Sequence, residues 1–434
     1  MSGLQLTLLT ALNMLGSGII MIPAKIAAVG TVSVLAWVAT GILAVCMAYV
    51  FANCGIFASH RGGLGGMAQT AFGMSGSFAA NYTYGVALVL ANIAIAMSAV
   101  SYLLCILNVP NDPILVQGLT IVVIWFSTFA NFPGAKFTGQ ISAIFIWGIF
   151  LPLLILICLG PFRFDADLFM NGWNSDGRSL PDVMKLAVPL MFWSFLGLES
   201  ACVNAESVEN PKTAMPKAIL VATGAVAVIY FLSTTLISGL VPRDTLAGSD
   251  APIFVVFHSI LGDTASKIFA CFIFMASASS LIGWQFTMAR VFETSAELGY
   301  FPEVFGKKSR AGGEQGGGIL ILTFVQTLLV MLLPNASLFT LFDAIVNFSC
   351  ITNIFSFFLC MAAAFVIMRN ARTSPRRRIL VCAMAGVSLL FMLWIFSLTD
   401  PVVLKWCSIA LLIGFAYYAV RRSVCSESDA DSTI

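Results

Sequence analysis

Charged residues are scarce in this chain of 434 residues. Asp, Glu, Lys and Arg together make up 10% of it, whereas they make up about 25% of a soluble globular protein. Apolar residues make up 59%, and the mean hydropathy is +0.96. This composition excludes a soluble protein and predicts an all-α polytopic membrane protein that lies in the lipid bilayer. The 22 basic and 20 acidic residues nearly balance and fall in short connections, so we expect no nucleic acid as a partner.

The chain also has little of what catalysis needs. Its two histidines, His60 and His258, are far apart, and no HExxH or paired-acid motif is present. We therefore expect neither an enzyme nor a bound metal or cofactor. Cysteines are more frequent, but their number, 11, is odd and most lie inside apolar runs, which argues against a disulfide framework. A channel is disfavoured, because the sequence has no filter-like repeat or ring of charges.

Long apolar runs are abundant. A helix that crosses a membrane needs about 20 such residues, and cutting the chain at its charged and Gly/Pro-rich connections gives twelve segments. They cover residues 4–29, 32–58, 77–107, 113–132, 137–161, 183–205, 214–241, 265–292, 318–334, 338–368, 379–398 and 402–420. We predict a single integral membrane domain over residues 1–434, with a cytoplasmic tail at 421–434.

The distribution of Lys and Arg predicts the orientation of these segments. If both termini are cytoplasmic, the inside connections and the C-terminus hold 15 of the 22 basic residues. These are Arg61, Lys136, Lys212, Lys217, Arg290, Lys307, Lys308, Arg310, Arg369, Arg372, Arg376, Arg377, Arg378, Arg421 and Arg422. We therefore predict a multi-pass protein of the bacterial inner membrane with both termini in the cytoplasm.

Two segments carry helix-breaking residues near their centres. The first contains Gly16, Ser17 and Gly18, and the sixth contains Gly197 two residues before Glu199. Irregular backbone at membrane depth survives only where it is buried or lines a cavity. Interruptions in the first and sixth spans are typical of transporters built from two inverted halves, whereas close packing of small residues is the alternative explanation. The expected parts are inverted repeats over about 4–161 and 183–368 and additional helices over about 379–420.

Glu199 is the most informative residue in the chain. A carboxylate at the centre of a bilayer is costly on any scale, so a functional role and a cationic partner are expected. No Lys or Arg lies at a matching depth in spans one to six. The sequence therefore predicts that the missing cation is the substrate. The alternative is a protonated glutamate that is hydrogen-bonded within a helix interface.

Other residues could complete a site for an amino acid or a diamine. Free N–H groups at Gly16, Ser17 and Gly18 would favour a carboxylate, with the Ser17 hydroxyl as an added donor. Trp193 and Trp284 would form aromatic walls, since cation–π contact with a desolvated alkylammonium contributes about 2 kcal/mol. A lone tryptophan in a membrane more often serves packing or interfacial anchoring, so this interpretation depends on the nearby acid.

Polar residues in spans three and ten are weaker candidates. Tyr84 and Asn92 are eight residues apart in span three and can share a helix face, but hydrogen bonds between helices account for them equally well. Asp343 is a second acid within an apolar run, near the outer end of span ten. Leu196, beside the interruption in span six, is a further candidate for contact with a substrate.

Several strings of the sequence are similar to one transporter family. The chain resembles the amino acid/polyamine/organocation superfamily and, within it, the basic amino acid/polyamine antiporters, most closely their putrescine/ornithine branch. The matching strings are NMLGSGIIMI (13–22), ANYTYGVALVLANIA (80–94), TGQIS (138–142), WSFLGLESACV (193–203), VENP (208–211) and GWQFT (283–287).

The resemblance implies a fold and a set of site residues. The implied fold has 12 transmembrane helices, arranged as a five-plus-five inverted repeat with broken helices 1 and 6 plus two C-terminal helices, often as a homodimer. The family assigns the substrate carboxylate to Ser17 and Gly18, and binding and gating to Trp193 and Glu199. Further matching positions of the family's site are Trp284, Asn92, Tyr84 and Cys54.

The chain departs from the branch at four positions. They are Gln69 in place of a glutamate, Phe415 in place of a tryptophan, Phe357 in place of a tyrosine and Asp343 in place of an asparagine. These changes leave the exchange mechanism intact and put diamine selectivity in question. The resemblance thus implies an antiporter that exchanges a diamine, putrescine, for a cationic amino acid, ornithine, by alternating access. A proton-coupled amino acid or polyamine uptake transporter with the same fold is the alternative.

Overall fold

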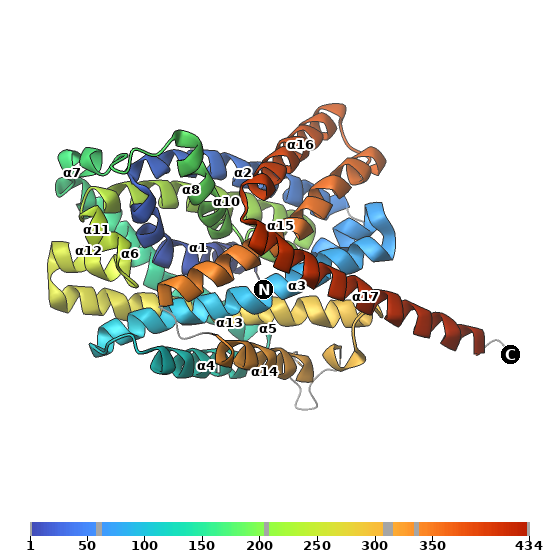
Figure 1. Cartoon of the computed structure of the whole chain (residues 1–434). Helices are drawn as coiled ribbons and strands as arrows, with labels where there is room; N and C mark the ends of the chain where they lie inside the picture. Colours follow the sequence, from blue (N-terminus) through green and yellow to red (C-terminus); the bar gives the residue numbers. More distant parts are fainter. Residues whose placement is uncertain (1, 58–62, 204–207, 307–315, 334–337, 432–434) are drawn as a thin grey trace.

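The computed structural model describes residues 2–57, 63–203, 208–306, 316–333 and 338–431, and all secondary structure in these residues is helical (Figure 1). His60, Arg61, Lys307, Lys308 and Arg310 lie outside the described residues, as does the side chain of Ser17.

The helices follow the apolar segments predicted from the sequence. In the described part of the chain, nine are long and apolar enough to cross a membrane, and the shorter helices α4 and α14, together with the interrupted sixth span, account for the other three segments. The long and paired helices are α1 (Gly3–Val29), α2 (Val34–Phe57), α3 (Gly63–Leu107), α4 (Pro113–Phe129), α5 (Ala135–Phe145), α6 (Trp147–Leu159), α8 (Leu180–Ser194), α9 (Ser200–Val203), α10 (Pro211–Ser238), α13 (Asp263–Glu297), α14 (Gly317–Met331), α15 (Leu338–Asn370), α16 (Pro375–Leu398) and α17 (Pro401–Asp431). Short helices in the connections are α7 (Ala166–Asn171), α11 (Arg243–Ala247) and α12 (Pro252–Leu261).

Side-chain caps define where several of these helices begin. The carboxylate of Asp112 accepts hydrogen bonds from the N–H groups of Ile114 and Leu115 at the start of α4, and Pro113 occupies the first helical position. Ser179 caps α8 in the same manner. Such caps satisfy N–H groups that have no partner within the helix, so the chain enters its spans with its polar backbone paired.

Helix α3 is longer than the segment predicted from hydropathy. It begins at Gly63 and bends at Gly73, where φ is +65° and ψ is −160°. A positive φ of this kind favours glycine, although a side chain at this position would meet no other atom within 4 Å. The turns before the bend are rich in glycine, so hydropathy alone does not assign them to the span.

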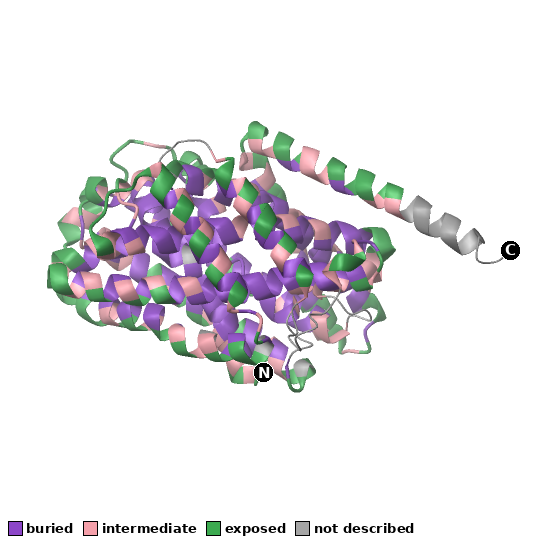
Figure 2. Ribbon diagram, turned by 90° about the horizontal axis from the view of Figure 1, so that it is seen from below, coloured by how far each residue is buried: buried purple, intermediate pink, exposed green. Residues whose placement is uncertain are grey.

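The centre of the bundle is α1. In its most apolar stretch 88% of the residues are buried, against 11% for α17. Helix α1 packs on α8, α10 and α13, while α3 packs along α13 and α15. Figure 2 shows buried residues concentrated in this centre and α17 extending away from it. The predicted tail is in part helical, since α17 continues to Asp431.

The sixth span is interrupted, but the first is not. Helix α8 ends at Ser194 and α9 begins at Ser200, as expected, whereas α1 continues through Gly16 and Gly18. The predicted break in the first span is therefore wrong for this conformation, because its glycines serve close packing. A Cβ at Gly18 would lie 2.6 Å from the Tyr230 hydroxyl and 2.9 Å from Ser194 Cβ.

Candidate functional site

The interruption of the sixth span places Glu199 at the centre of the bundle. Gly197 has a φ of +122°, and a Cβ there would lie 3.0 Å from the backbone of Asn13 and Met14 in α1. Both the conformation and the close approach require glycine. The Gly197 N–H donates to Glu199 Oε2 at 2.8 Å, and the Ser200 hydroxyl donates to the Gly197 carbonyl at 2.6 Å. The break is thus held by the residues that follow it.

Glu199 is fully buried and is hydrogen-bonded to a residue of the predicted site. The Tyr84 hydroxyl of α3 donates to its Oε1 at 3.0 Å. Among the described residues, no Lys or Arg forms an ion pair with Glu199. The structure therefore leaves this acid with hydrogen-bond donors but with no cationic partner from the described part of the chain.

The middle turn of α1 accepts hydrogen bonds from neighbouring helices. The carbonyl of Leu12 accepts from the Ser280 hydroxyl at 3.4 Å, and that of Asn13 accepts from Trp284 Nε1 at 3.1 Å. The carbonyl of Met14 accepts from the hydroxyl of Tyr230 in α10. In a regular helix these carbonyls also receive the N–H groups of residues 16, 17 and 18. Each of these three carbonyls therefore has a side-chain donor in addition to the backbone N–H of the helix.

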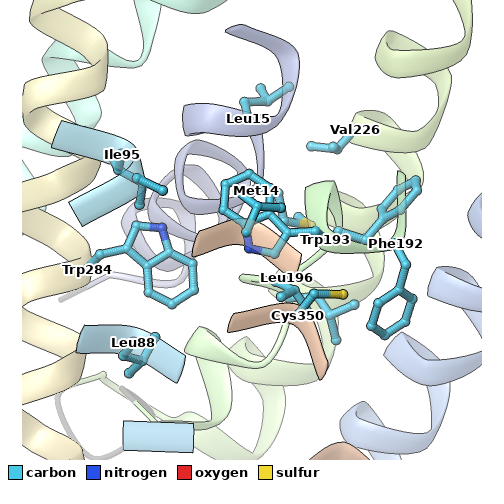
Figure 3. Close-up of a cluster of buried hydrophobic side chains, with 14 of the residues drawn as sticks. Met14, Leu15, Leu88, Ile95, Phe192, Trp193, Leu196, Val226, Trp284 and Cys350 are labelled. Carbon is cyan, nitrogen blue, oxygen red and sulfur yellow. The ribbon is translucent and has the colours of Figure 1, made fainter. Parts of the chain in front are cut away.

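A small cavity lies between α1, α3, α8, α13 and α15. Its volume is about 20 Å³, which is room for one water molecule and not for a diamine. In Figure 3 the indole of Trp284 projects from α13 toward Met14 and Trp193, and Leu88 and Leu196 lie below them. The lining residues are Asn13, Met14, Gly18, Leu88, Ala91, Ile95, Trp193, Leu196, Trp284 and Asn353.

The structure brings some of the predicted site residues to this cavity and leaves others near it. Gly18, Trp193, Leu196 and Trp284 line it. The remaining predicted residues do not line it in this conformation: Gly16, Tyr84, Asn92, Glu199 and Cys54. Asn92 instead donates from Nδ2 to the sulfur of Met288 at 3.6 Å.

Two asparagines of the cavity wall were missed as candidates for substrate contact. Asn13 and Asn353 are 3% and 2% exposed. Both amide atoms of Asn13, Oδ1 of Asn353 and Nε1 of Trp193 have no hydrogen-bond partner among the described residues. An unpaired buried polar atom costs about 1–3 kcal/mol. The sequence shows only that each amide lies in an apolar span, and this does not reveal whether the amide has a hydrogen-bond partner.

A larger cavity opens at the end of the bundle that the sequence predicts to be outside. Its volume is about 500 Å³, and it is lined by Lys25, Lys185, Asp343 and Asp400, among others; we call it the vestibule. Lys25 Nζ lies 3.4 Å from Asp343 Oδ1, and the Asp343 side chain is 43% exposed. Asp343 therefore faces this vestibule and an internal ammonium group, and it does not line the central cavity.

Trp193 lines the central cavity and contacts Phe342, which precedes the vestibule residue Asp343 in the chain. The α8 residues that line the vestibule are Lys185, Leu186, Pro189 and Leu190, whereas Trp193, less than one turn further along, lines the central cavity. The ring of Phe342 packs edge-on against Trp193, with 5.8 Å between the centroids.

A guanidinium group secures the end of α1 beside the vestibule. Arg243 donates from Nε to the Ala27 carbonyl and from Nη2 to the Ala28 carbonyl, both at 2.9 Å. It also forms two hydrogen bonds with the Asp176 carboxylate, at 2.6 and 2.7 Å. Arg243 holds the pKa of Asp176 below its usual range, chiefly through these hydrogen bonds. The last turn of α1 is thus joined to two connecting segments.

The other departures from the family pattern lie away from the central cavity. Gln69 donates to the sulfur of Met74 at 3.2 Å in the first part of α3. Phe357 is fully buried against Phe51 and Phe192. Phe415 of α17 packs against a ring of α3 and is 40% exposed. None of them lines the central cavity.

Comparison with known proteins identifies relatives along nearly the whole chain. The "Putrescine transporter PotE" of Escherichia coli (strain K12) is 39% identical over 420 residues, which is 97% of this chain and 95% of the relative. The protein of the same name from Haemophilus influenzae is 39% identical over 414 residues, 95% of each chain. The "Cadaverine/lysine antiporter" of Escherichia coli (strain K12) is 30% identical over 323 residues, 74% of this chain and 72% of the relative.

Solved structures and family models agree on the fold. The crystal structure of MhsT in complex with L-phenylalanine matches with a TM-score of 0.68 over 92% of this chain and 98% of that one, at 14% identity, which is evidence for the fold alone. The amino acid permease family model matches residues 1–416. The resemblance inferred from the motifs is thereby confirmed. The chain belongs to the amino acid permease family.

Proposed function

We propose that this chain is an antiporter that exchanges putrescine for ornithine across a bacterial inner membrane by alternating access. The observation that carries the proposal is Glu199, a fully buried carboxylate with no cationic partner among the described residues, next to a cavity walled by two tryptophans. A buried acid of this kind calls for a cation. The names of the relatives, a putrescine transporter and a cadaverine/lysine antiporter, support a diamine and a cationic amino acid as substrates. They support a transporter rather than an enzyme.

Binding of either substrate requires the central cavity to widen. Its present volume of about 20 Å³ does not admit a diamine, and Glu199 is not among the residues that line it. We propose that displacement of the turn at 195–199 brings the carboxylate to the substrate ammonium. Trp193 and Trp284 would then close over the aliphatic stem, where contact with a desolvated ammonium is favourable.

The carboxylate of ornithine would be held by Ser17 and Gly18 at the middle of α1. Turning their N–H groups toward the substrate breaks hydrogen bonds to the carbonyls of Asn13 and Met14. These carbonyls already accept from Trp284 and from a tyrosine of α10. They would stay paired when the turn opens, which lowers the cost of binding a carboxylate there.

Alternating access would use the two cavities in turn. We propose that the repeats over about 4–161 and 183–368 rock about the central site and that Trp193 separates it from the vestibule. Asn92, Tyr84 and Cys54 would act from behind the cavity wall, Tyr84 by orienting Glu199.

Counterflow in proteoliposomes tests the proposed exchange. Vesicles loaded with ornithine should take up external labelled putrescine, and vesicles loaded with buffer alone should not. Uptake that needs no internal substrate but follows a pH gradient would identify the proton-coupled transporter instead. If no putrescine enters under either condition, the substrate assignment is wrong.

A pair of variants tests the role of Glu199. Glu199→Gln should abolish exchange, because the amide gives the substrate ammonium no charge to pair with. The matched control is Glu293→Gln, which removes another buried acid; Glu293 pairs with Arg290 of its own helix at 2.9 Å and does not line the cavity. Normal exchange by Glu199→Gln would remove the assigned role.

The arrangement in the membrane completes the proposal. We propose that both termini are cytoplasmic, on the distribution of Lys and Arg, and that the chain forms a homodimer, as the family resemblance implies. A fluorescent protein fused to the C-terminus should fluoresce in intact bacteria, because it folds in the cytoplasm. A dark fusion that is fully expressed would reverse the orientation.

A further inference from the structure

Four buried polar atoms without a described partner belong to residues that line the central cavity. Asn13 and Asn353 line the cavity, are at least nine-tenths buried, and keep amide atoms without a partner among the described residues. Trp193 adds an unpaired indole N–H to the same wall. Buried polar groups are normally hydrogen-bonded, so we expect these atoms to bond to a ligand that enters the cavity.

Other buried asparagines of the bundle show what a structural amide looks like. The Asn131 amide donates to the carbonyls of Ser127 and Ile282 and accepts from the Thr138 hydroxyl. Asn81 likewise accepts from one backbone N–H and donates to two hydroxyl groups. These amides join helices together. Asn13 and Asn353 line the cavity instead, and both amide atoms of Asn13 and Oδ1 of Asn353 make no such bonds to described residues.

We propose that Asn13 and Asn353 are substrate-binding residues and that their amides bind either the carboxylate of ornithine or an ammonium of putrescine. The inference rests on the proposed function and explains how one site takes both an amino acid and a diamine. An amide Nδ2 donates to a carboxylate, and its Oδ1 accepts from an ammonium. At one end putrescine has an ammonium alone, whereas ornithine has an ammonium and a carboxylate on the same carbon.

The exchange between the two modes needs only a rotation of the amide. The torsion between Cβ and Cγ of asparagine is broad and roughly two-fold, so half a turn interchanges oxygen and nitrogen with little change of shape. The amide of Asn13 breaks no hydrogen bond to a described residue when it turns. Trp193 Nε1 only donates, so it serves the carboxylate alone.

Two substitutions of Asn353 separate binding from packing. Asn353→Leu keeps the approximate size and removes both hydrogen-bonding atoms. It should weaken the binding of labelled putrescine and of labelled ornithine to purified protein by about tenfold or more each, because hydrogen bonds to charged groups are strong. Asn353→Asp keeps the acceptor, removes the donor and adds a negative charge. It should keep or strengthen putrescine binding while weakening ornithine binding, and so change the ratio of the two Kd values at least tenfold.

The matched control is Thr223→Val in α10. Thr223 is fully buried and its hydroxyl also lacks a described partner, but it does not line the cavity. This variant should bind both substrates as the unmodified protein does. Opposite changes for two ligands in Asn353→Asp cannot come from misfolding.

The outcomes distinguish this inference from the proposed function. If the unmodified protein binds both substrates and both Asn353 variants bind them equally well, the amides only hold a water molecule and the inference is overturned, while the exchange proposal stands. If Asn353→Asp weakens both ligands equally, the amide does not discriminate between them and the inference is also wrong. If the unmodified protein binds neither substrate, the proposed function fails and this inference fails with it.

Discussion

Replacing Gly197 by alanine tests how closely the interrupted sixth span is fitted against α1. The φ of +122° disfavours a side chain, and strain of this kind costs about 1–3 kcal/mol. The new Cβ would also lie 3.0 Å from the α1 backbone and 3.1 Å from the Trp284 ring. Overpacking against backbone adds about 1–3 kcal/mol. We therefore expect Gly197→Ala to lower the free energy of unfolding by about 2–6 kcal/mol.

The assay is thermal unfolding of the purified protein in detergent, followed by putrescine binding below the transition. Gly224→Ala is the control. Gly224 lies in α10 with a helical φ, and the Cβ that alanine adds there would have no neighbour within 4 Å. Alanine at this position should raise stability by about 0.5–1 kcal/mol. If Gly197→Ala unfolds at the temperature of the unmodified protein and binds putrescine normally, the close approach of the break to α1 does not exist in solution.

Three further predictions concern residues around the site and its entrance. Tyr84→Phe should reduce the affinity for putrescine less than the loss of the Glu199 carboxylate does, because it removes one donor and leaves the charge; equal losses in a binding assay would contradict this. Asp343→Asn should lower the free energy of unfolding by about 1–3 kcal/mol, because Asp343 is 43% exposed but its partner Lys25 is only 4% exposed and loses a charged acceptor, and it should leave the Kd of the central site unchanged; a large change in Kd would place Asp343 in that site. The ion pair of Asp176 should contribute stability above the usual Asp pKa of about 3.9 and lose it as the pH falls through the lowered folded-state value; melting curves between pH 5 and pH 2 (roughly this window) that match those of an Asp176→Asn variant would refute it.

Much of the fold follows from the sequence because a bilayer imposes length and composition on every span. The twelve apolar runs each correspond to a helix or helix pair, and the interruption before Glu199 is visible in the sequence as a glycine next to a buried acid. The conformation of the first span could not be predicted in this way. Gly16 and Gly18 could either interrupt the helix or allow another helix to pack closely against it. The outcome depends on contacts with Ser280 and Tyr230, which are far away in the sequence.

The candidate site was predictable in part for the same reason. Trp193 and Trp284 could be identified from their motifs, and both line the cavity. Asn353 could not, because an amide in an apolar span can bond in any direction and only the packed structure shows that its oxygen lacks a partner among the described residues. The pairing of Asp343 with Lys25 joins α15 to α1 and is likewise a property of the packed helices.

The attachment of Arg243 to the end of α1 has a mechanical consequence. Its guanidinium holds the carbonyls of Ala27 and Ala28 and is itself anchored by a carboxylate. One end of the helix is thereby fixed to the surrounding connections, while its middle turn has spare hydrogen-bond donors around Gly16 and Gly18. We expect α1 to bend at this middle turn, so that the half between Gly3 and the glycines moves while the end held by Arg243 stays in place.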